Sequence, residues 1–411
     1  MRQLQRQFPS IGKGCPRLDE FKRKLGQWRR YSRETVVEER DGIPVFANEF
    51  WTSKQRAAHS LHEISYRACF KPQLPRFFIE RLTDPGDVVF DPFMGRGTTL
   101  LEAALLGRDA LGNDVNPLAR ILVEARLAPP TLSEVAARLE CLALDEPIER
   151  PEGFEVFFDE RTLNQICRLR AYLAERRFSG RADKVDRWIQ MVAINRLTGH
   201  SKGFFSVYTL PPNQAASIES QRKINARRGQ RPEYRDVAQL ILRKTRVLLR
   251  DAEAQAPKGR SRGFFQQTVD VPFDYDGPRV ALAVTSPPFM DIVNYKQDNW
   301  MRCWFAGVDP DAICITQTRK LAEWKALVRG ALESVAAIAH PGGVFAFEVG
   351  EIRRGSLLLD RVVAEVAQET AWEPACVVIN EQTFTKTSNM WGIDNNKRGT
   401  NSNRIVVMQK R

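Results

Sequence analysis

The sequence predicts an α/β fold: an open, Rossmann-like sheet with helices on both faces. Two observations favour it. A strand, a turn, a helix and a second strand follow one another between residues 86 and 114, and the same alternation returns between 280 and 408. With 411 residues and 43% apolar content, the chain is also long enough to bury a full core.

The first of these segments has the pattern of a βαβ unit. Residues 87–91 form a short apolar run, residues 92–97 are rich in turn formers, and residues 98–106 have helical apolar spacing that ends at Gly107. A second short strand is expected at 110–114. Strand, crossover helix and strand within about 30 residues imply a parallel pair with a right-handed crossover.

The later segments complete the expected sheet. Strands are predicted at 280–285, 344–348, 376–379 and 405–408, with a helix at 358–369. We therefore assign 46–130 and 265–411 to one sheet domain.

Residues 131–264 read as an inserted, mainly helical region. Charge-rich helices are expected at 161–177, 183–197 and 234–255, and residues 257–263 (PKGRSRG) as a flexible basic linker.

The net charge of +12 is concentrated in two places. Residues 1–30 hold nine Lys or Arg against two acids, and residues 221–262 hold thirteen against four. Such clusters suit a polyanion, because each neutralised phosphate releases condensed counterions; a solvated basic face is the alternative. We assign 1–45 to a basic N-terminal arm. The candidate nucleic-acid contacts are Arg222, Lys223, Arg227 and Arg228.

Membrane, disulfide and metal functions find no support in the sequence. No stretch approaches the ~18 apolar residues of a membrane span, and we expect a cytoplasmic protein. The seven cysteines are scattered and form no CxxC pair. His59 and His62 lie three residues apart without a third ligand nearby, so no metal is expected.

The segment DPFMGRGTT at 91–99 lies where the first strand gives way to the helix. Ligands of open parallel sheets bind at this end of the strands. Gly95 and Gly97 allow close backbone approach, and the helix beginning near Thr98 offers free N–H groups to an anion. Asp114, at the end of the second strand, suits the hydroxyls of a ribose. A dinucleotide site is disfavoured because Leu100 stands where a third glycine is expected; a tight turn with a structural Asp is the other alternative.

The segment TSPPF at 285–289 directly follows the apolar strand 280–284. Two prolines make a stiff loop with outward carbonyls. The Ser286 hydroxyl and the Pro287 carbonyl suit the two hydrogens of an exocyclic amino group, and Phe289 suits stacking on a flipped base. A simple polyproline turn is the alternative.

Together, DPFMGRGTT and TSPPF resemble the S-adenosylmethionine-dependent amino-methyltransferases of DNA, which act on N4 of cytosine or N6 of adenine. Segments 60–78, 293–307, 341–351 and 397–407 are similar to further motifs of that family. The (S/T)SPP(Y/F) form resembles the N4-cytosine branch. The resemblance implies a class I methyltransferase sheet with a terminal antiparallel strand, and a target-recognition role for 131–264.

Residue by residue, the resemblance implies two sets of positions. The S-adenosylmethionine positions are Asp91, Pro92, Phe93, Gly95, Gly97, Thr98, Thr99, Asp114 and Asn116, with Lys71 and Gln73 closing over the cofactor and Asp270, placed only by its position after an expected strand, at the adenine. The catalytic positions are Ser286, Pro287, Pro288 and Phe289.

The resemblance implies a site-specific N4-cytosine methyltransferase acting on double-stranded DNA with base flipping, and a restriction endonuclease of the same specificity as a partner. Open alternatives are N6-adenine methylation of DNA, guanine methylation of tRNA, and a DNA-binding protein without turnover. C5-cytosine chemistry is disfavoured because it needs a cysteine nucleophile, usually in a Pro-Cys pair; Cys15 precedes its proline, and Pro374-Ala375-Cys376 has the wrong context.

Overall fold

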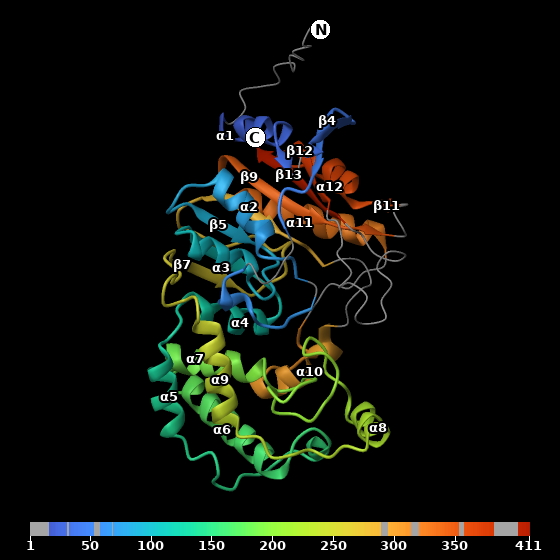
Figure 1. Ribbon diagram of the computed structural model, residues 1–411. Helices are drawn as coiled ribbons and strands as arrows, with labels where there is room; N and C mark the ends of the chain where they lie inside the picture. Colours follow the sequence, from blue (N-terminus) through green and yellow to red (C-terminus); the bar gives the residue numbers. More distant parts are fainter. Residues whose placement is uncertain are drawn as a thin grey trace.

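The computed structural model describes residues 16–30, 33–52, 58–67, 69–288, 295–313, 320–352, 357–381 and 402–411. These residues form a sheet domain and a helical domain, stacked one above the other in Figure 1. The helical domain comprises α5 to α9. Helix α10 follows strand β8 of the sheet domain in the sequence, but it packs against the helical domain.

The helices have the following bounds: α1 Pro16–Gly26, η2 Ser60–His62, α2 Gln73–Leu82, α3 Thr98–Leu105, α4 Pro117–Leu127, α5 Leu132–Glu140, η3 Phe154–Val156, α6 Glu160–Phe178, α7 Lys184–Ile194, α8 Ile218–Arg228, α9 Val237–Leu249, α10 Tyr295–Ala306, α11 Leu321–Ile338 and α12 Leu359–Gln368. The strands are β1 Arg29–Arg30, β2 Arg33–Glu34, β3 Val36–Arg40, β4 Ile43–Asn48, β5 Val88–Asp91, β6 Asp109–Asn113, β7 Ser261–Phe265, β8 Val280–Thr285, β9 Ala339–Val349, β10 Glu351–Ile352, β11 Leu357–Leu358, β12 Trp372–Glu381 and β13 Ser402–Lys410.

Within the described residues, nine strands form one sheet in the order β3-β4-β12-β13-β9-β8-β5-β6-β7. The strands β9, β8, β5, β6 and β7 are parallel, whereas β13 lies antiparallel between β9 and β12. The chain runs outward from β5 in one direction and from β8 in the other, so the strand order reverses between these two strands. The predicted Rossmann-like sheet with a terminal antiparallel strand is confirmed.

Helices cover both faces of this sheet because side chains alternate along each strand. In β5, Val89 joins the core under α1, α2 and α3, whereas Val88 and Phe90 join the core under α11 and α12. All three are buried. The sheet is therefore the middle layer of a three-layer domain, as predicted.

Residues 16–30 and 33–48 belong to the sheet domain and not to an arm. In α1, Phe21 packs against Phe77 and Phe78 of α2, with ring centroids 6.0 and 5.9 Å apart. Strands β3 and β4 form a hairpin, and β4 pairs in parallel with β12. The expected boundary at residue 45 falls inside β4, and of the expected arm only residues 1–15, 31 and 32 lie outside the described residues.

The expected linker at 257–263 is also ordered structure. Residues from Ser261 onward form β7, which pairs in parallel with β6. Gly259 lies so close to the backbone that a Cβ there would meet the carbonyl oxygen of Arg108 at 1.7 Å. The inserted region therefore ends before residue 261.

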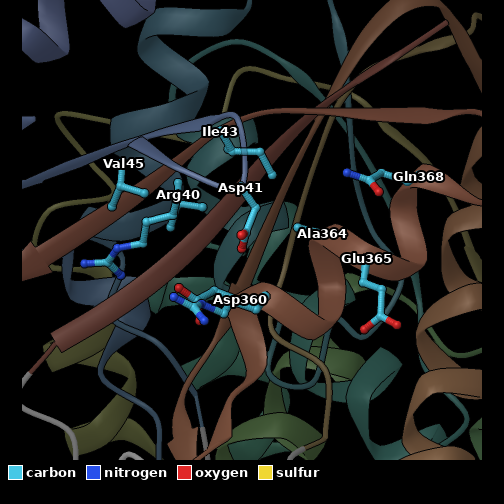
Figure 2. Close-up of a pocket in the computed structure, with 10 residues that line it drawn as sticks. Arg40, Asp41, Ile43, Val45, Asp360, Ala364, Glu365 and Gln368 are labelled. Carbon is cyan, nitrogen blue, oxygen red and sulfur yellow. The ribbon is translucent and has the colours of Figure 1, made fainter. Parts of the chain in front are cut away.

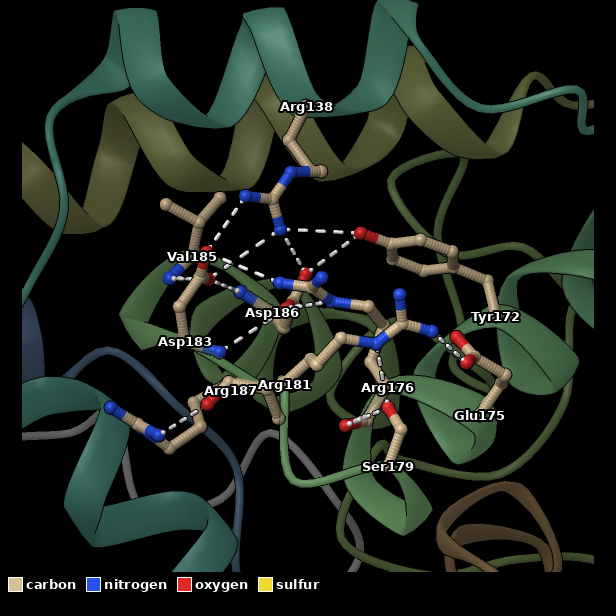
Figure 3. A network of polar contacts seen from close by, with 11 residues as sticks. Arg138, Tyr172, Glu175, Arg176, Ser179, Arg181, Asp183, Val185, Asp186 and Arg187 are labelled. Atoms are coloured by element: carbon tan, nitrogen blue, oxygen red, sulfur yellow. Dashed lines mark hydrogen bonds and ion pairs between the residues drawn. The ribbon is translucent and has the colours of Figure 1, made fainter.

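A buried carboxylate ties the helices of the helical domain together. Asp186 in α7 accepts hydrogen bonds from Nε of Arg176 in α6, at 2.9 Å, and from the hydroxyl of Tyr172, at 3.1 Å. Arg138 of α5 binds the same carboxylate. Figure 3 shows these side chains converging on Asp186. In the described part of the chain, no helix combines the length and the apolar character needed to cross a bilayer.

Candidate active site

The two loops singled out in the sequence leave neighbouring strands of the sheet. Strand β5 leads into the glycine-containing loop 91–99, β8 leads into the proline loop 285–288, and the two strands pair in parallel. The Thr285 hydroxyl donates to Oδ1 of Asp91 at 2.5 Å, and the Thr99 hydroxyl donates to the carbonyl of Val284 at 3.1 Å. The two loops therefore begin at one edge of one sheet, where its strand order reverses.

The glycine loop needs its glycines. Gly95 and Gly97 have φ of 48° and 72°, in the left-handed region that side chains disfavour. A Cβ on Gly97 would lie 2.2 Å from Cγ2 of Val123, so a side chain there also collides with α4. Gly97 precedes Thr98, the first residue of α3, and the free N–H groups of that helix face this turn.

Asp114 closes the other side of the glycine loop. Its Oδ2 accepts from the backbone N–H of Gly95 and its Oδ1 from that of Asn116, both at 2.8 Å. Partial burial is the largest influence on its pKa and raises it to about 6, against the two hydrogen bonds. A carboxylate oxygen can accept two hydrogen bonds, and each oxygen of Asp114 accepts one from the backbone, so each retains one position for a ligand hydroxyl.

Asp91 is a second carboxyl with a raised pKa. It is buried, and this loss of hydration raises its pKa to about 7 although Thr285 and the Phe93 N–H both donate to it. A buried carboxyl of this kind ionises readily only when positive charge comes near.

The segment before α2 covers the glycine loop. A Cβ on Gly95 would lie 3.6 Å from the Tyr66 ring and 3.9 Å from Sγ of Cys69. The pKa of Lys71 is lowered, chiefly by burial and also by the nearby guanidinium of Arg96. Gln73 begins α2. The structure thus brings Lys71 close to the glycine loop.

Two buried arginines, which the sequence pattern did not indicate, hold the segment before α2 in place. Arg96 donates from Nη1 to the carbonyl of Ile64 at 3.0 Å and from Nε to the hydroxyl of Thr98 at 3.1 Å. Arg126 of α4 donates to the carbonyl of Arg96 and, at 3.2 Å, to that of Leu61. Burial lowers the pKa of Arg126 to about 9. Both side chains hold loop carbonyls, a role that leaves no local sequence signal.

The proline loop contacts a buried acid that the sequence also missed. Ser286 is hydrogen-bonded to Glu348 of β9, and Nδ2 of Asn403 in β13 donates to Oε1 of the same carboxyl at 3.0 Å. Burial raises the pKa of Glu348 above its usual range. Nε1 of Trp324 donates to the carbonyl of Pro288 at 3.1 Å, which fixes the direction of the loop. Phe289 lies outside the described residues.

The remaining expected site residues lie outside the glycine loop and the proline loop. Asn116 caps the N-terminus of α4 by accepting from the N–H of Leu118. Asp270 is exposed and its Cβ packs against Gly330 of α11, so the structure gives no support to its assignment to the adenine. Arg222, Lys223, Arg227 and Arg228 lie on α8, in the helical domain.

The two histidines considered as metal ligands have other partners. Nε2 of His59 lies 3.0 Å from the carbonyl of Gln255, and Nε2 of His62 lies 2.7 Å from Oε1 of Glu102. Within the described residues, no three His, Cys, Asp or Glu side chains gather in a metal-binding group.

A separate pocket of about 290 Å³ lies at the far edge of the sheet (Figure 2). It is bounded by the turn between β3 and β4, by Val377 of β12, and by the exposed side of α12. None of the predicted site residues lines it.

The segment that carries the first half of the site is similar to known proteins. Residues 17–122 match the family model described as DNA methylase, of the N6/N4 type. The type II methyltransferase M.MjaII of Methanocaldococcus jannaschii is 37% identical over 82 residues, which are 20% of this chain and 15% of the relative. The type II methyltransferase M.MvaI of Kocuria varians is 32% identical over 108 residues, 25% of this chain and 23% of the relative. The matched stretches thus span less than a quarter of either relative.

Among solved structures, the rRNA methyltransferase aviRa of Streptomyces viridochromogenes aligns with 87% of this chain and 93% of its own, at 13% identity and a TM-score of 0.34. TrmN of Thermus thermophilus aligns with 86% of this chain and 52% of its own, at 13% identity and a TM-score of 0.32.

Proposed function

We propose that this chain, whose residues 17–122 match the DNA methylase family model, transfers a methyl group from S-adenosylmethionine to N4 of cytosine in DNA. The observation that carries the proposal is the junction of the two loops. The Thr285–Asp91 hydrogen bond holds the glycine loop and the proline loop together at one edge of the sheet. The first loop suits a nucleoside, and the second suits an amino group.

The residues of the glycine loop fit S-adenosylmethionine. Asp114 keeps two acceptor positions for the ribose hydroxyls, and the N-terminus of α3 suits the carboxylate of the methionine portion. Asp91 and Asp114 supply carboxyls whose ionisation a cationic ligand favours. When bound, S-adenosylmethionine supplies an electrophilic methyl group on a sulfonium.

The proline loop fits an exocyclic amino group. Such a nitrogen is a poor nucleophile, because its lone pair is delocalised into the ring. Ser286 directs its hydroxyl hydrogen toward Glu348, so its oxygen lone pairs remain to accept one N–H. The Pro287 carbonyl accepts the other, and the two bonds favour pyramidal nitrogen.

Glu348 also suits the removal of the proton that the amine loses on methylation. Because its pKa is raised, the carboxyl takes a proton more readily than an exposed glutamate does. The proton passes from the amine to the Ser286 oxygen while the hydroxyl proton passes to Glu348, so no charged serine is required. Phe289 stacks on the flipped base.

The substrate is duplex DNA, and a restriction endonuclease of the same specificity is the partner. The two relatives are named as type II methyltransferases, and the basic residues of α8 supply phosphate contacts. The sequence Thr-Ser-Pro-Pro-Phe favours cytosine N4 over adenine N6.

The test is methyl transfer by the purified chain. Duplex DNA of random sequence is incubated with tritiated S-adenosylmethionine, digested to nucleosides and separated. We expect the label in N4-methylcytosine, and its loss with Ser286→Ala. Label in N6-methyladenine would contradict the choice of base, and label in tRNA but not in DNA would contradict the substrate.

A further inference from the structure

We propose that α8 and the loop before it form the surface that reads the target sequence, with α8 entering the major groove and Tyr208 contacting the bases. We call residues 199–230 the α8 head. This inference rests on the proposed function and identifies the part of the helical domain that selects the site.

Helix α8 has one narrow apolar side, where Ile218 and Ile224 pack, partly buried, against the core of the helical domain. Gln221 is its only fully buried residue. Amide side chains fix the same helix further: Nε2 of Gln221 donates to the carbonyl of Tyr208 at 3.0 Å, and Nδ2 of Asn225 donates to the carbonyl of Val156 at 2.8 Å. A helix that is fixed on one side and polar on the others has those other sides available to a polar partner.

The charge of α8 identifies that partner as a polyanion. Four basic side chains are exposed on this helix of 11 residues, and the ion pairs of two of them are weak. Arg222 reaches Glu155 only at 4.0 Å, and Lys223 pairs with Glu219 one helical turn away, with all four side chains well exposed. Ion pairs of this kind contribute little, so phosphates compete with them readily.

Tyr208 presents a rigid aromatic ring beside these charges. Its side chain and that of Leu210 are each 36% exposed. The guanidinium carbon of Arg228 lies 3.8 Å above the ring centroid, and Nε2 of Gln230 donates to the Tyr208 carbonyl at 2.8 Å, as Gln221 does. An ordered aromatic ring loses little entropy on binding, which suits it to contact with bases.

The α8 head is attached to the helix that follows the proline loop. Nε1 of Trp300 in α10 donates to the carbonyl of Ala216 at 3.1 Å, just before α8 begins. The buried Arg302 donates to the carbonyl of Pro212 at 2.7 Å and to that of Ser65 at 3.0 Å. In Figure 1, α8 stands apart from the bundle of α5, α6, α7 and α9, on the side of α10. DNA held by the α8 head is therefore held beside α10.

The experiment separates base reading from phosphate binding. Wild-type protein is used to select bound duplexes from a random pool, and affinity is measured against salt concentration. We expect Tyr208→Ala to relax the preference at one or more positions of the selected motif by about tenfold, with an unchanged salt dependence. We expect Arg227→Ala to weaken binding to every duplex and to lower the slope of log K against log salt by about 1.

Two variants of the same domain serve as matched controls. Tyr234 is 41% exposed and also lies under an arginine, Arg161, at 4.5 Å, and Arg246 is an exposed arginine on α9. Tyr234→Ala and Arg246→Ala should leave motif and salt slope unchanged. Tyr208→Phe, which keeps the ring, should keep the motif if the loop remains folded.

The outcomes distinguish this inference from the proposed function. A wild-type motif that survives Tyr208→Ala, or a wild-type protein that selects no motif, overturns the reading role of the α8 head while methyl transfer still stands. Selective binding that depends on Tyr208, without transfer of label to any DNA, supports the α8 head and overturns the proposed function.

Discussion

The hydroxyl of Thr285 lies 2.5 Å from Oδ1 of Asp91, and both side chains are buried. This hydrogen bond joins the last residue of β8 to the last residue of β5, two strands that pair in parallel but lie far apart in the sequence. It fixes the start of the proline loop relative to the start of the glycine loop. The geometry of the proposed reaction depends on that relation.

The first prediction concerns this bond. Thr285→Val keeps the shape of the side chain but removes the donor, so Asp91 loses a hydrogen bond in a buried site. We expect the free energy of unfolding in urea to fall by about 1–3 kcal/mol. Affinity for S-adenosylmethionine, measured by calorimetry, should fall roughly tenfold.

Thr245→Val is the matched control for that change. Thr245 is buried in the helical domain and accepts from Nε1 of Trp188 at 3.0 Å. Thr245→Val should lower the free energy of unfolding without changing the affinity for S-adenosylmethionine. Equal loss of affinity in both variants would show that the Thr285 effect is a general loss of stability.

The second prediction concerns pH. The pKa of Asp91 is about 7 in the folded chain against about 3.9 in an unfolded one, so between these values the folded state keeps a proton that the unfolded state releases. Rising pH therefore lowers stability across this window and has no further effect through Asp91 above it. The free energy of unfolding of Asp91→Asn minus that of the wild type should rise from pH 5 to 7 and remain constant above pH 7. A difference that is flat from pH 5 to 7 would contradict the raised pKa.

The third prediction concerns Glu348, which acts through Ser286: it orients the hydroxyl of Ser286 and takes up its proton during the proposed reaction. Glu348→Gln preserves the volume but leaves one of its two donors, Ser286 or Asn403, facing an amide N–H₂ group. We expect kcat for methyl transfer to fall by about 100-fold, with the Kd for S-adenosylmethionine within about twofold of wild type.

Asp360→Asn is the matched change at a buried acid outside the site. Asp360 pairs with Arg404 at 3.2 Å and lines the separate pocket of Figure 2. It should alter stability without altering kcat. A parallel loss of kcat and cofactor affinity in Glu348→Gln would indicate a disturbed fold and not a misplaced hydroxyl.

The fourth prediction concerns the carboxylate of Figure 3. Asp186 is buried and binds Arg138, Arg176 and Tyr172, so Asp186→Ala leaves partly buried donors without an acceptor. We expect a loss of about 3 kcal/mol in the free energy of unfolding of the helical domain. Asp145→Ala removes an exposed partner of Arg161 and should cost less than about 1 kcal/mol. Equal costs would contradict the central role of Asp186.

Strands with a strong apolar pattern were predictable. The strand expected at 280–285 coincides with β8, and the expected helix at 358–369 is α12 within one residue at each end. The first residues of β7 were assigned to a flexible linker because its sequence, Ser-Arg-Gly-Phe-Phe, lacks an apolar run, and these residues form a strand by pairing with β6.

The hairpin β3–β4 carried a signal that the charge of the N-terminus obscured. Asp41 and Gly42 have φ of 52° and 77°, and an Asp-Gly pair between Val-rich segments is a recognised hairpin turn. Glu348 carried no such signal. It lies inside an apolar strand, and only the folded sheet brings it to Ser286, which is 62 positions away in the sequence.

The most direct test of the central claim is long-read sequencing of plasmid DNA from a methylation-free host that expresses this chain. The two-loop site predicts N4-methylcytosine at one sequence motif in cells with the wild-type chain and none in cells with Ser286→Ala. Unmodified DNA from cells that contain folded wild-type protein, or modification that survives Ser286→Ala, would contradict it.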